Sequence, residues 1–315
     1  MAGSCNICVV GGVNVDITGL PNDKLLSGDS NPGQVSLSLG GVGRNIAESL
    51  ARLGANVRLV TLLGDDLHAE WIRRGCEHAG IDLSLSGVLE GMPSGMYLCI
   101  NDERGNLCTA ISDMRLCDAI TPAYLAERLP ALNSADAVVL DANLPEITLR
   151  WLADAVHVPL AADPVSVKKA PRLRGILPSL ALLKPNQPET LAILGSHEDN
   201  CDPLSIAKAL TERGVRNVLM TLGSQGVCYA DENLSGFQPC LTGPVVSTNG
   251  CGDASLSAGL VAILEGRDIR EAALLGQAAA AICARSPKAV NPEMTWDAVC
   301  GLAFRHSKRL EEISC

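Results

Sequence analysis

Residues 245–254 read VVSTNGCGDA and combine a small, glycine-rich turn with an acid. The sequence after Asp253, ASLSAGLVAILEG, is apolar and compatible with a helix that ends near Gly266. The turn 250–252 therefore lies at the amino end of a predicted helix, where free backbone N–H groups and the helix dipole attract anions. Small residues there let a phosphate group approach the backbone closely.

The acid that follows this turn indicates more than anion binding, because a carboxylate beside a phosphate is repulsive. As a general base, it would take a proton from an attacking hydroxyl group while the backbone amides stabilise the transferred group. The turn therefore predicts phosphoryl transfer. The alternative is an ordinary glycine turn followed by an acid that stabilises a helix start. The predicted catalytic residues are Asp253, Gly250, Cys251 and Gly252.

Composition and charge restrict the class of protein. The chain has 315 residues, of which 47% are hydrophobic and 19% charged, enough apolar material for a large core. Its formal charge of −10 disfavours a nucleic acid or an anionic membrane as a partner. Neither a secretory leader nor an apolar stretch of about 18 residues stands out in the sequence. We therefore expect a cytoplasmic globular protein that acts on a small molecule.

Apolar runs alternate with helical stretches along most of the chain, which predicts βαβ units and a mainly parallel sheet. Helices are expected within 43–54 and from a cap at Asp65 to about Ala79. The lid segments, about 13–39 and 92–114, alternate apolar and polar residues and predict a small half-exposed sheet. We expect one main domain over 1–315 with this small sheet as a lid.

Polar residues follow the predicted parallel strands where each strand ends. The carboxyl ends of such strands meet at one edge of a sheet, so these side chains are expected to converge there. They are Asp141, Asn143, Asp163, Lys184, Asn186, Thr221, Gly223 and Ser224.

Two glycine-rich segments near the amino end predict further binding groups. Residues 40–45, GGVGRN, bring Gly40 and Gly41 close to a ligand and place Asn45 on the first turn of a helix. A dinucleotide site is a weak alternative, because the preceding strand has the alternating pattern of a half-exposed one. After the first strand, Asp16 can accept two hydrogen bonds from a vicinal diol, and Asn14 can donate and accept.

Four motifs resemble the ribokinase-like (PfkB) family of carbohydrate and nucleoside kinases. They are GGVGRN, KPNQPE, TLGSQG and VSTNGCGDA, in this order and spread over nearly the whole chain. The resemblance implies a three-layer α/β/α fold with a β lid, ATP as phosphoryl donor and Mg²⁺ as its ion. It also implies a homodimer formed through the lid.

The resemblance assigns roles to individual residues. Asp253 matches the catalytic base, and residues 250–252 match the anion hole. Asn186 and Glu189 match a motif that organises Mg²⁺ and phosphate, with a helix-start carboxylate as the alternative for Glu189. The cofactor-binding residues implied are Lys184, Asn186, Thr221, Gly223, Gly226, Ala280 and Cys283.

Three positions in and just before the phosphate turn depart from the family pattern. Ser247 stands where relatives carry an aspartate that helps to hold a monovalent cation, which puts activation by K⁺ in doubt. Asn249 and Cys251 replace the commoner threonine and alanine. Both are small enough to keep the turn, so activity is expected to persist.

Further segments resemble those family members that phosphorylate the 5′-hydroxyl of pseudouridine: 29–33 (DSNPG), 112–114 (SDM) and 163–166 (DPVS). Another sugar or purine nucleoside kinase, an inactive sugar or nucleoside sensor, and an NAD-dependent oxidoreductase are the alternatives. Retention of Asp253 argues against the sensor. The substrate-binding residues expected are Asn14, Asp16, Ser30, Asn31, Gly40, Gly41, Asn45, Asp113 and Asp163.

Overall fold

The computed structural model describes residues 5–196, 202–241 and 243–313. Its main element is a nine-stranded sheet of order β15-β14-β13-β12-β11-β10-β1-β4-β6. Neighbouring strands from β13 to β6 are parallel, and β14 is antiparallel to both of its neighbours. The predicted mainly parallel sheet is confirmed. The strands are β1 (Asn6–Val10), β4 (Asn56–Val60), β6 (Ile81–Asp82), β10 (Ala137–Asp141), β11 (Leu160–Asp163), β12 (Leu180–Leu183), β13 (Val218–Thr221), β14 (Gly226–Ala230) and β15 (Ser235–Pro239).

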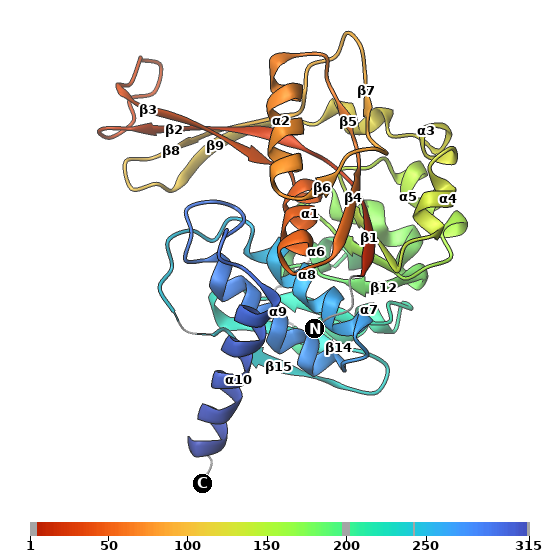
Figure 1. Ribbon diagram of the computed structural model, residues 1–315. Coiled ribbons are helices and arrows are strands. Elements are labelled where there is room, and N and C mark those ends of the chain that lie inside the picture. Colours follow the sequence, from red (N-terminus) through yellow and green to blue (C-terminus); the bar gives the residue numbers. More distant parts are fainter. Residues whose placement is uncertain (1–4, 197–201, 242, 314–315) are drawn as a thin grey trace.

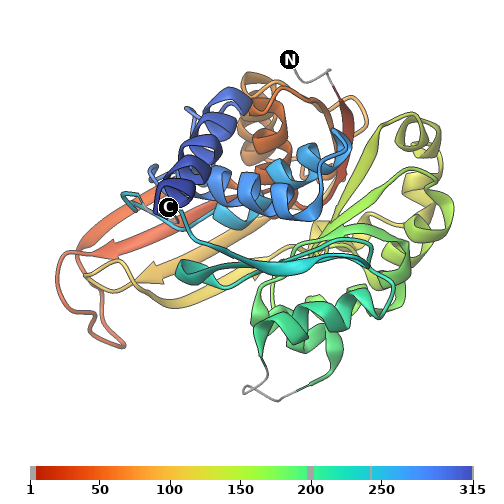
Figure 2. The same cartoon turned by 90° about the horizontal axis from the view of Figure 1, so that it is seen from below.

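Helices cover both faces of this sheet, which gives three layers (Figure 2). Along β1, Ile7 and Val9 join one buried core while Cys8 and Val10 join the other, as expected of a strand covered on both faces. The first core packs against α1 (Val42–Arg52), α2 (Leu67–His78), α8 (Cys251–Leu264), α9 (Ile269–Cys283) and α10 (Trp296–Ile313). The second packs against α3 (Pro122–Ala126), α4 (Leu129–Asn133), α5 (Glu146–Ala155), α6 (Gln187–Leu194) and α7 (Pro203–Thr211).

A separate four-stranded sheet, of order β3-β2-β8-β9, projects to one side of the main sheet (Figure 1). It consists of β2 (Asn14–Pro21), β3 (Gly33–Gly40), β8 (Met96–Asn101) and β9 (Leu107–Asp113). The small half-exposed sheet expected from alternation is therefore present. In the register, Asp16 pairs with Ser38 and Tyr97, whereas Ile17 pairs with Leu37 and Leu98. The sheet thus has one polar face and one apolar face.

The helix boundaries confirm one prediction and correct another. α1 is followed by Gly54, whose φ of 95° matches its predicted place at the helix end. The cap of α2, however, is Asp66 and not Asp65. Asp66 accepts a hydrogen bond from the Ala69 amide, while the Asp65 carboxylate accepts one from the Gly91 amide.

The apolar run after α1 does not form one continuous strand. It divides at Thr61 into β4 and β5 (Leu62–Leu63), and β5 pairs with β7 (Gly87–Val88) outside the main sheet. None of the helices in the described parts of the chain is long and apolar enough to cross a membrane.

Candidate active site

The turn at residues 250–252 begins α8, as the sequence predicts. Gly250 is the N-cap and has a φ of 76°, and a methyl group on it would overlap the carbonyl oxygen of Ala289. A methyl group on Gly252 would lie 2.7 Å from Nζ of Lys184. Glycine is therefore required at Gly250 by backbone conformation and by contact with a carbonyl, whereas a side chain at Gly252 would displace the Lys184 ammonium group.

Asp253 lies in the first turn of α8 and is 8% exposed. Its Oδ2 accepts a hydrogen bond of 3.1 Å from Nδ2 of Asn45. Burial raises the pKa of Asp253 to about 8, and the Asp163 carboxylate adds to this rise, while Lys184 and Asn45 oppose it. A carboxyl group whose pKa lies near neutral pH is suited to general base catalysis.

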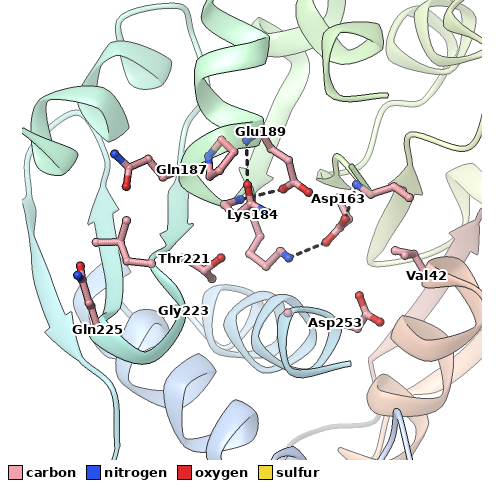
Figure 3. Close-up of a pocket in the computed structure, with 14 residues that line it drawn as sticks. Val42, Asp163, Lys184, Gln187, Glu189, Thr221, Gly223, Gln225 and Asp253 are labelled. Carbon is pink, nitrogen blue, oxygen red and sulfur yellow. Dashed lines mark hydrogen bonds and ion pairs between the residues drawn. The ribbon is translucent and has the colours of Figure 1, made fainter. Parts of the chain in front are cut away.

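Lys184 and Asp163 form a buried ion pair of 2.8 Å at the carboxyl ends of two adjacent strands (Figure 3). Burial lowers the pKa of Lys184, but the carboxylates of Asp163, Asp253 and Glu189 outweigh it, so the net direction is upward. The sequence places Asp163 with the substrate and Lys184 with the nucleotide. The structure pairs the two side chains with each other.

A strained turn supports the Asp163 side of this pair. The amide of Ser166 donates to the carbonyl of Pro164 at 2.7 Å, and Val165 between them has a φ of 67°. This is a γ-turn in its strained form, which is rare for a β-branched residue. The Val165 amide also donates to Oδ1 of Asp163 at 2.7 Å. Backbone strain of this kind is concentrated at functional sites.

Asn186 and Glu189 form a capping box at the start of α6. Oδ1 of Asn186 accepts from the Glu189 amide at 2.8 Å, and Oε2 of Glu189 accepts from the Asn186 amide at 2.8 Å. The helix-start role considered for Glu189 is therefore present. Burial, followed by the charge of Asp163, raises the pKa of Glu189. Capping uses the single side-chain oxygen of Asn186 and one of the two carboxylate oxygens of Glu189, and both residues also line a cavity.

Two cavities meet at Asp253. The smaller one, about 520 Å³, lies along the carboxyl ends of β11 to β13 (Figure 3). The larger one, about 1880 Å³, lies between the small sheet, α1 and the turn before α8. Predicted residues in the smaller cavity are Asp163, Lys184, Asn186, Glu189, Thr221, Gly223 and Gly252, together with Asp253. Predicted residues in the larger cavity are Asn14, Asp16, Gly41, Asn45, Asn186, Gly250 and Asp253.

Several predicted residues lie elsewhere. Gly40 faces the Asp16 carboxylate, and Gly226 faces the backbone of β15. In the loop after β2, Asn31 holds its own loop together through Leu26. Neither cavity includes the following predicted residues: Ser30, Asn31, Gly40, Asp113, Gly226, Ala280, Cys251 and Cys283.

Local contacts explain several of these placements. Asp113 is paired with Arg115 at 2.7 Å, which engages its carboxylate outside the cavity. The Cys251 thiol lies 3.5 Å from the Ala280 carbonyl, and the Cys283 thiol lies 3.6 Å from that of Asn249. Ala280 and Cys283 thus pack behind the phosphate turn. The backbone of Cys251 remains part of that turn.

Sequence reasoning missed some residues of the site. Arg44 lines the larger cavity and donates from Nη1 to Oδ1 of Asn45 at 3.3 Å. Val165 lines both cavities, and its backbone strain has no signature in residue type. The sequence does contain a signal for Arg44, since this residue immediately precedes Asn45 in the glycine-rich motif 40–45. Lys169 of the larger cavity donates to Asn143 at 2.5 Å, a contact between residues far apart in sequence.

Relatives of known class share this architecture. The model of the pfkB family of carbohydrate kinases matches residues 5–296. The pseudouridine kinase of Escherichia coli (strain K12) is 29% identical over 292 residues, which cover 92% of this chain and 93% of that protein. A solved carbohydrate kinase from Agrobacterium tumefaciens is 31% identical and has a TM-score of 0.83, with 95% of this chain and 97% of that chain covered.

A ribokinase from Arabidopsis thaliana, solved with ribose and ATP, is 24% identical and has a TM-score of 0.81, with 96% of this chain and 99% of that chain covered. The three layers and the small sheet are those of the ribokinase-like fold. With the family model matching almost the full length, the chain belongs to the pfkB family of carbohydrate kinases and is a sugar or nucleoside kinase that phosphorylates a hydroxyl group.

Proposed function

We propose that this enzyme transfers the γ-phosphoryl group of ATP to the 5′-hydroxyl of pseudouridine, giving pseudouridine 5′-phosphate. The observation that carries the proposal is the position of Asp253, which lines both cavities. The smaller cavity takes the nucleotide, and the larger one takes the nucleoside. The acceptor hydroxyl and the γ-phosphate then meet beside one carboxylate.

In this mechanism Asp253 accepts the proton of the 5′-hydroxyl as its oxygen attacks the γ-phosphorus and ADP leaves. The backbone amides of residues 250–252, at the positive end of α8, stabilise the charge on the transferred group. Lys184 supplies a positive charge next to Gly252. The protein's contribution is positioning and electrostatics, as in other phosphoryl transfers.

Asn186 and Glu189 are the residues that we propose for Mg²⁺. The described residues contain no cluster of three or more His, Cys, Asp or Glu side chains that could hold a metal ion. Mg²⁺ does not require such a cluster, because it keeps several waters and uses one or two carboxylates together with substrate phosphates. When bound, the ion neutralises charge on the phosphates.

The larger cavity supports a nucleoside rather than a free sugar as substrate. Nδ2 of Asn14 donates to Oδ1 of Asp16 at 2.5 Å, which leaves the Asp16 carboxylate oriented to accept from ribose hydroxyls. From the small sheet, Ser38, Tyr97 and Ser112 line the same cavity and offer partners for a base. Pseudouridine has two ring N–H groups to satisfy. The pseudouridine kinase relative is consistent with this choice.

The proposal is tested by ADP release with Mg-ATP and, one at a time, pseudouridine, uridine, inosine, ribose and fructose, each with and without K⁺. Preference for pseudouridine over uridine supports the proposal. Turnover of a free sugar alone retains the kinase and rejects the nucleoside. An inactive sensor would bind a ligand and release no ADP with any member of the panel. Dependence on K⁺ would show that Ser247 does not prevent activation by a monovalent cation.

We also propose that the small sheet is a lid and that two copies of the chain pair through it. Its polar face lines the larger cavity, while its opposite face carries exposed apolar side chains. A solvent-exposed apolar sheet face of this kind favours association. The residues exposed on that face are Val35, Leu37, Leu98, Ile100 and Ile111. Sedimentation of the wild type and of Ile111→Lys, at a position that does not line the larger cavity, tests the pairing, and a wild-type monomer would reject it.

A further inference from the structure

A series of polar contacts runs along α1 and ends at Asp253. The guanidinium group of Arg52 donates to Oε1 of Glu48 from Nε at 3.0 Å and from Nη2 at 2.7 Å. The other Glu48 oxygen accepts from Nη2 of Arg44. Nη1 of Arg44 donates to Oδ1 of Asn45 at 3.3 Å, and Nδ2 of Asn45 donates to Oδ2 of Asp253 at 3.1 Å. A buried arginine is thus connected to the proposed base through one side-chain amide.

The orientation of the Asn45 amide determines whether its donor end or its acceptor end contacts Asp253. An asparagine side chain has a donor end and an acceptor end, which exchange when it rotates by half a turn. After such a rotation, the oxygen of Asn45 would face the Asp253 carboxylate, and its NH₂ group would face Arg44, which carries donors alone. Both contacts would be unfavourable while Asp253 is ionised, which is the form that accepts the substrate proton. Arg44 therefore keeps the donor end of Asn45 on Asp253.

Stability alone does not account for an arginine at this position. Arg44 is 8% exposed, and its partner Glu48 is 6% exposed. Ion pairs at such depth are often replaceable by apolar residues without loss of stability, because desolvation offsets their attraction. Arg44 also lines the larger cavity beside Asn14 and Asp16. Its location therefore points to a role in the site.

We propose that Arg44 is a positioning residue, which acts through Asn45 to hold the Asp253 carboxylate in the orientation that accepts the substrate proton. The inference rests on the proposed role of Asp253 as general base. An Arg44 substitution leaves in place the charged groups that face Asp253 from the main sheet. Those groups are Asp141, Asp163 and Lys184.

Kinetics of Arg44→Met test this role, since methionine keeps the apolar stem and removes the donors. The expected result is a kcat lower by roughly 10- to 100-fold, because the base is misplaced. The KM for ATP should stay within about twofold. The matched control is Arg74→Met, which removes the arginine of an i,i+4 ion pair whose side chain is 75% exposed, and it should retain wild-type kinetics.

A double variant separates action through Asn45 from a general packing defect. If Arg44 acts through this amide, Arg44→Met added to Asn45→Ala causes no further loss of kcat. Additive losses, or an Arg44→Met enzyme with the wild-type kcat, would overturn the proposal. If Arg44→Met does not fold, Arg44→Gln carries the same comparison, since a glutamine side chain offers an acceptor as well as donors and no longer fixes the orientation of Asn45.

A second measurement does not depend on activity. In protein labelled with [¹³C]aspartate, the carboxyl signal of Asp253 is assigned by its loss in Asp253→Asn and followed against pH. Removal of the oriented hydrogen bond in Arg44→Met should move this titration to higher pH. An unchanged titration rejects the inference even if the enzyme is a kinase. A shifted titration in a protein with no kinase activity upholds the contact and rejects the proposed function.

Discussion

Replacing Asp253 by asparagine should inactivate the enzyme and, at the same time, stabilise its fold. Burial raises the pKa of this carboxyl group from 3.8 to about 8. Between these pH values the folded protein holds a proton that the unfolded chain releases, so stability falls as pH rises. A shift of about 4 pH units, at about 1.4 kcal/mol per unit, sets an upper limit on the order of 6 kcal/mol for this loss of stability.

Asparagine cannot ionise and therefore does not carry this cost. The unfolding free energy of Asp253→Asn should be close to that of the wild type near pH 4 and exceed it by at least about 1 kcal/mol at pH 8. Urea unfolding at pH 5, 6, 7 and 8 measures the difference. Asp154→Asn is the control, because Asp154 is an exposed carboxylate on α5 and its substitution should give no such trend.

The same variant should lower kcat by about 10²- to 10⁴-fold, as expected for loss of a general base. ADP release under saturating substrates measures this. If Asp253→Asn is no more stable than the wild type at pH 8, or equally more stable at every pH, the reasoning about its buried charge is wrong. Near-normal turnover would remove Asp253 from the role of base.

Three further comparisons test other parts of the site. In urea unfolding, Val165→Gly should cost at least about 1 kcal/mol less than Val158→Gly, because glycine accepts the φ of 67° at position 165 and both valines are half-buried in loops. Equal costs would show that the γ-turn stores no strain. Gly250→Ala should lower stability by at least about 2 kcal/mol more than Gly266→Ala, since both have positive φ but an added methyl group meets a carbonyl only at Gly250. Similar melting temperatures would contradict this. Glu189→Gln should keep the capping box and hence stability within about 1 kcal/mol, while the Mg²⁺ concentration for half-maximal rate rises roughly 10-fold or more. An unchanged Mg²⁺ requirement in the ADP assay would remove Glu189 from the proposed metal site.

Much of the architecture was predictable because the patterns that define it are local. Continuous apolar runs mark the strands of the main sheet, and Gly54 and Gly266 end helices with φ values of 95° and 81°. The choice between Asp65 and Asp66 was not predictable in this way. Either acid satisfies a capping pattern, and the Asp65 carboxylate is engaged instead by the amide of Gly91, which the fold brings from a distant loop.

The site was predictable as a group of residues but not as a set of contacts. That polar strand ends converge follows from parallel topology, and Asp163 and Lys184 do come together. Their mutual pairing depends on which strands are neighbours, which residue spacing does not specify. The same holds for Asn31, in the loop between β2 and β3, and for Asp113, at the end of β9, because residue type alone does not specify their contacts. Their side chains bond within their own segments, to Leu26 and to Arg115.

The two faces of the small sheet have an evolutionary consequence. Residues of β2, β3, β8 and β9 contribute to the wall of the larger cavity, while the proposed nucleotide cavity and the Asp253 turn are formed mainly by the strand ends of the main sheet, α6 and α8. Mutations at the cavity-facing positions of the small sheet can therefore change which acceptor molecule is held without touching the groups that handle ATP. Substitutions on this sheet face, together with those on α1 and α2 that line the same cavity, are the changes through which a duplicated gene would acquire a new acceptor. The alternating strand pattern thus makes the scaffold easy to diversify.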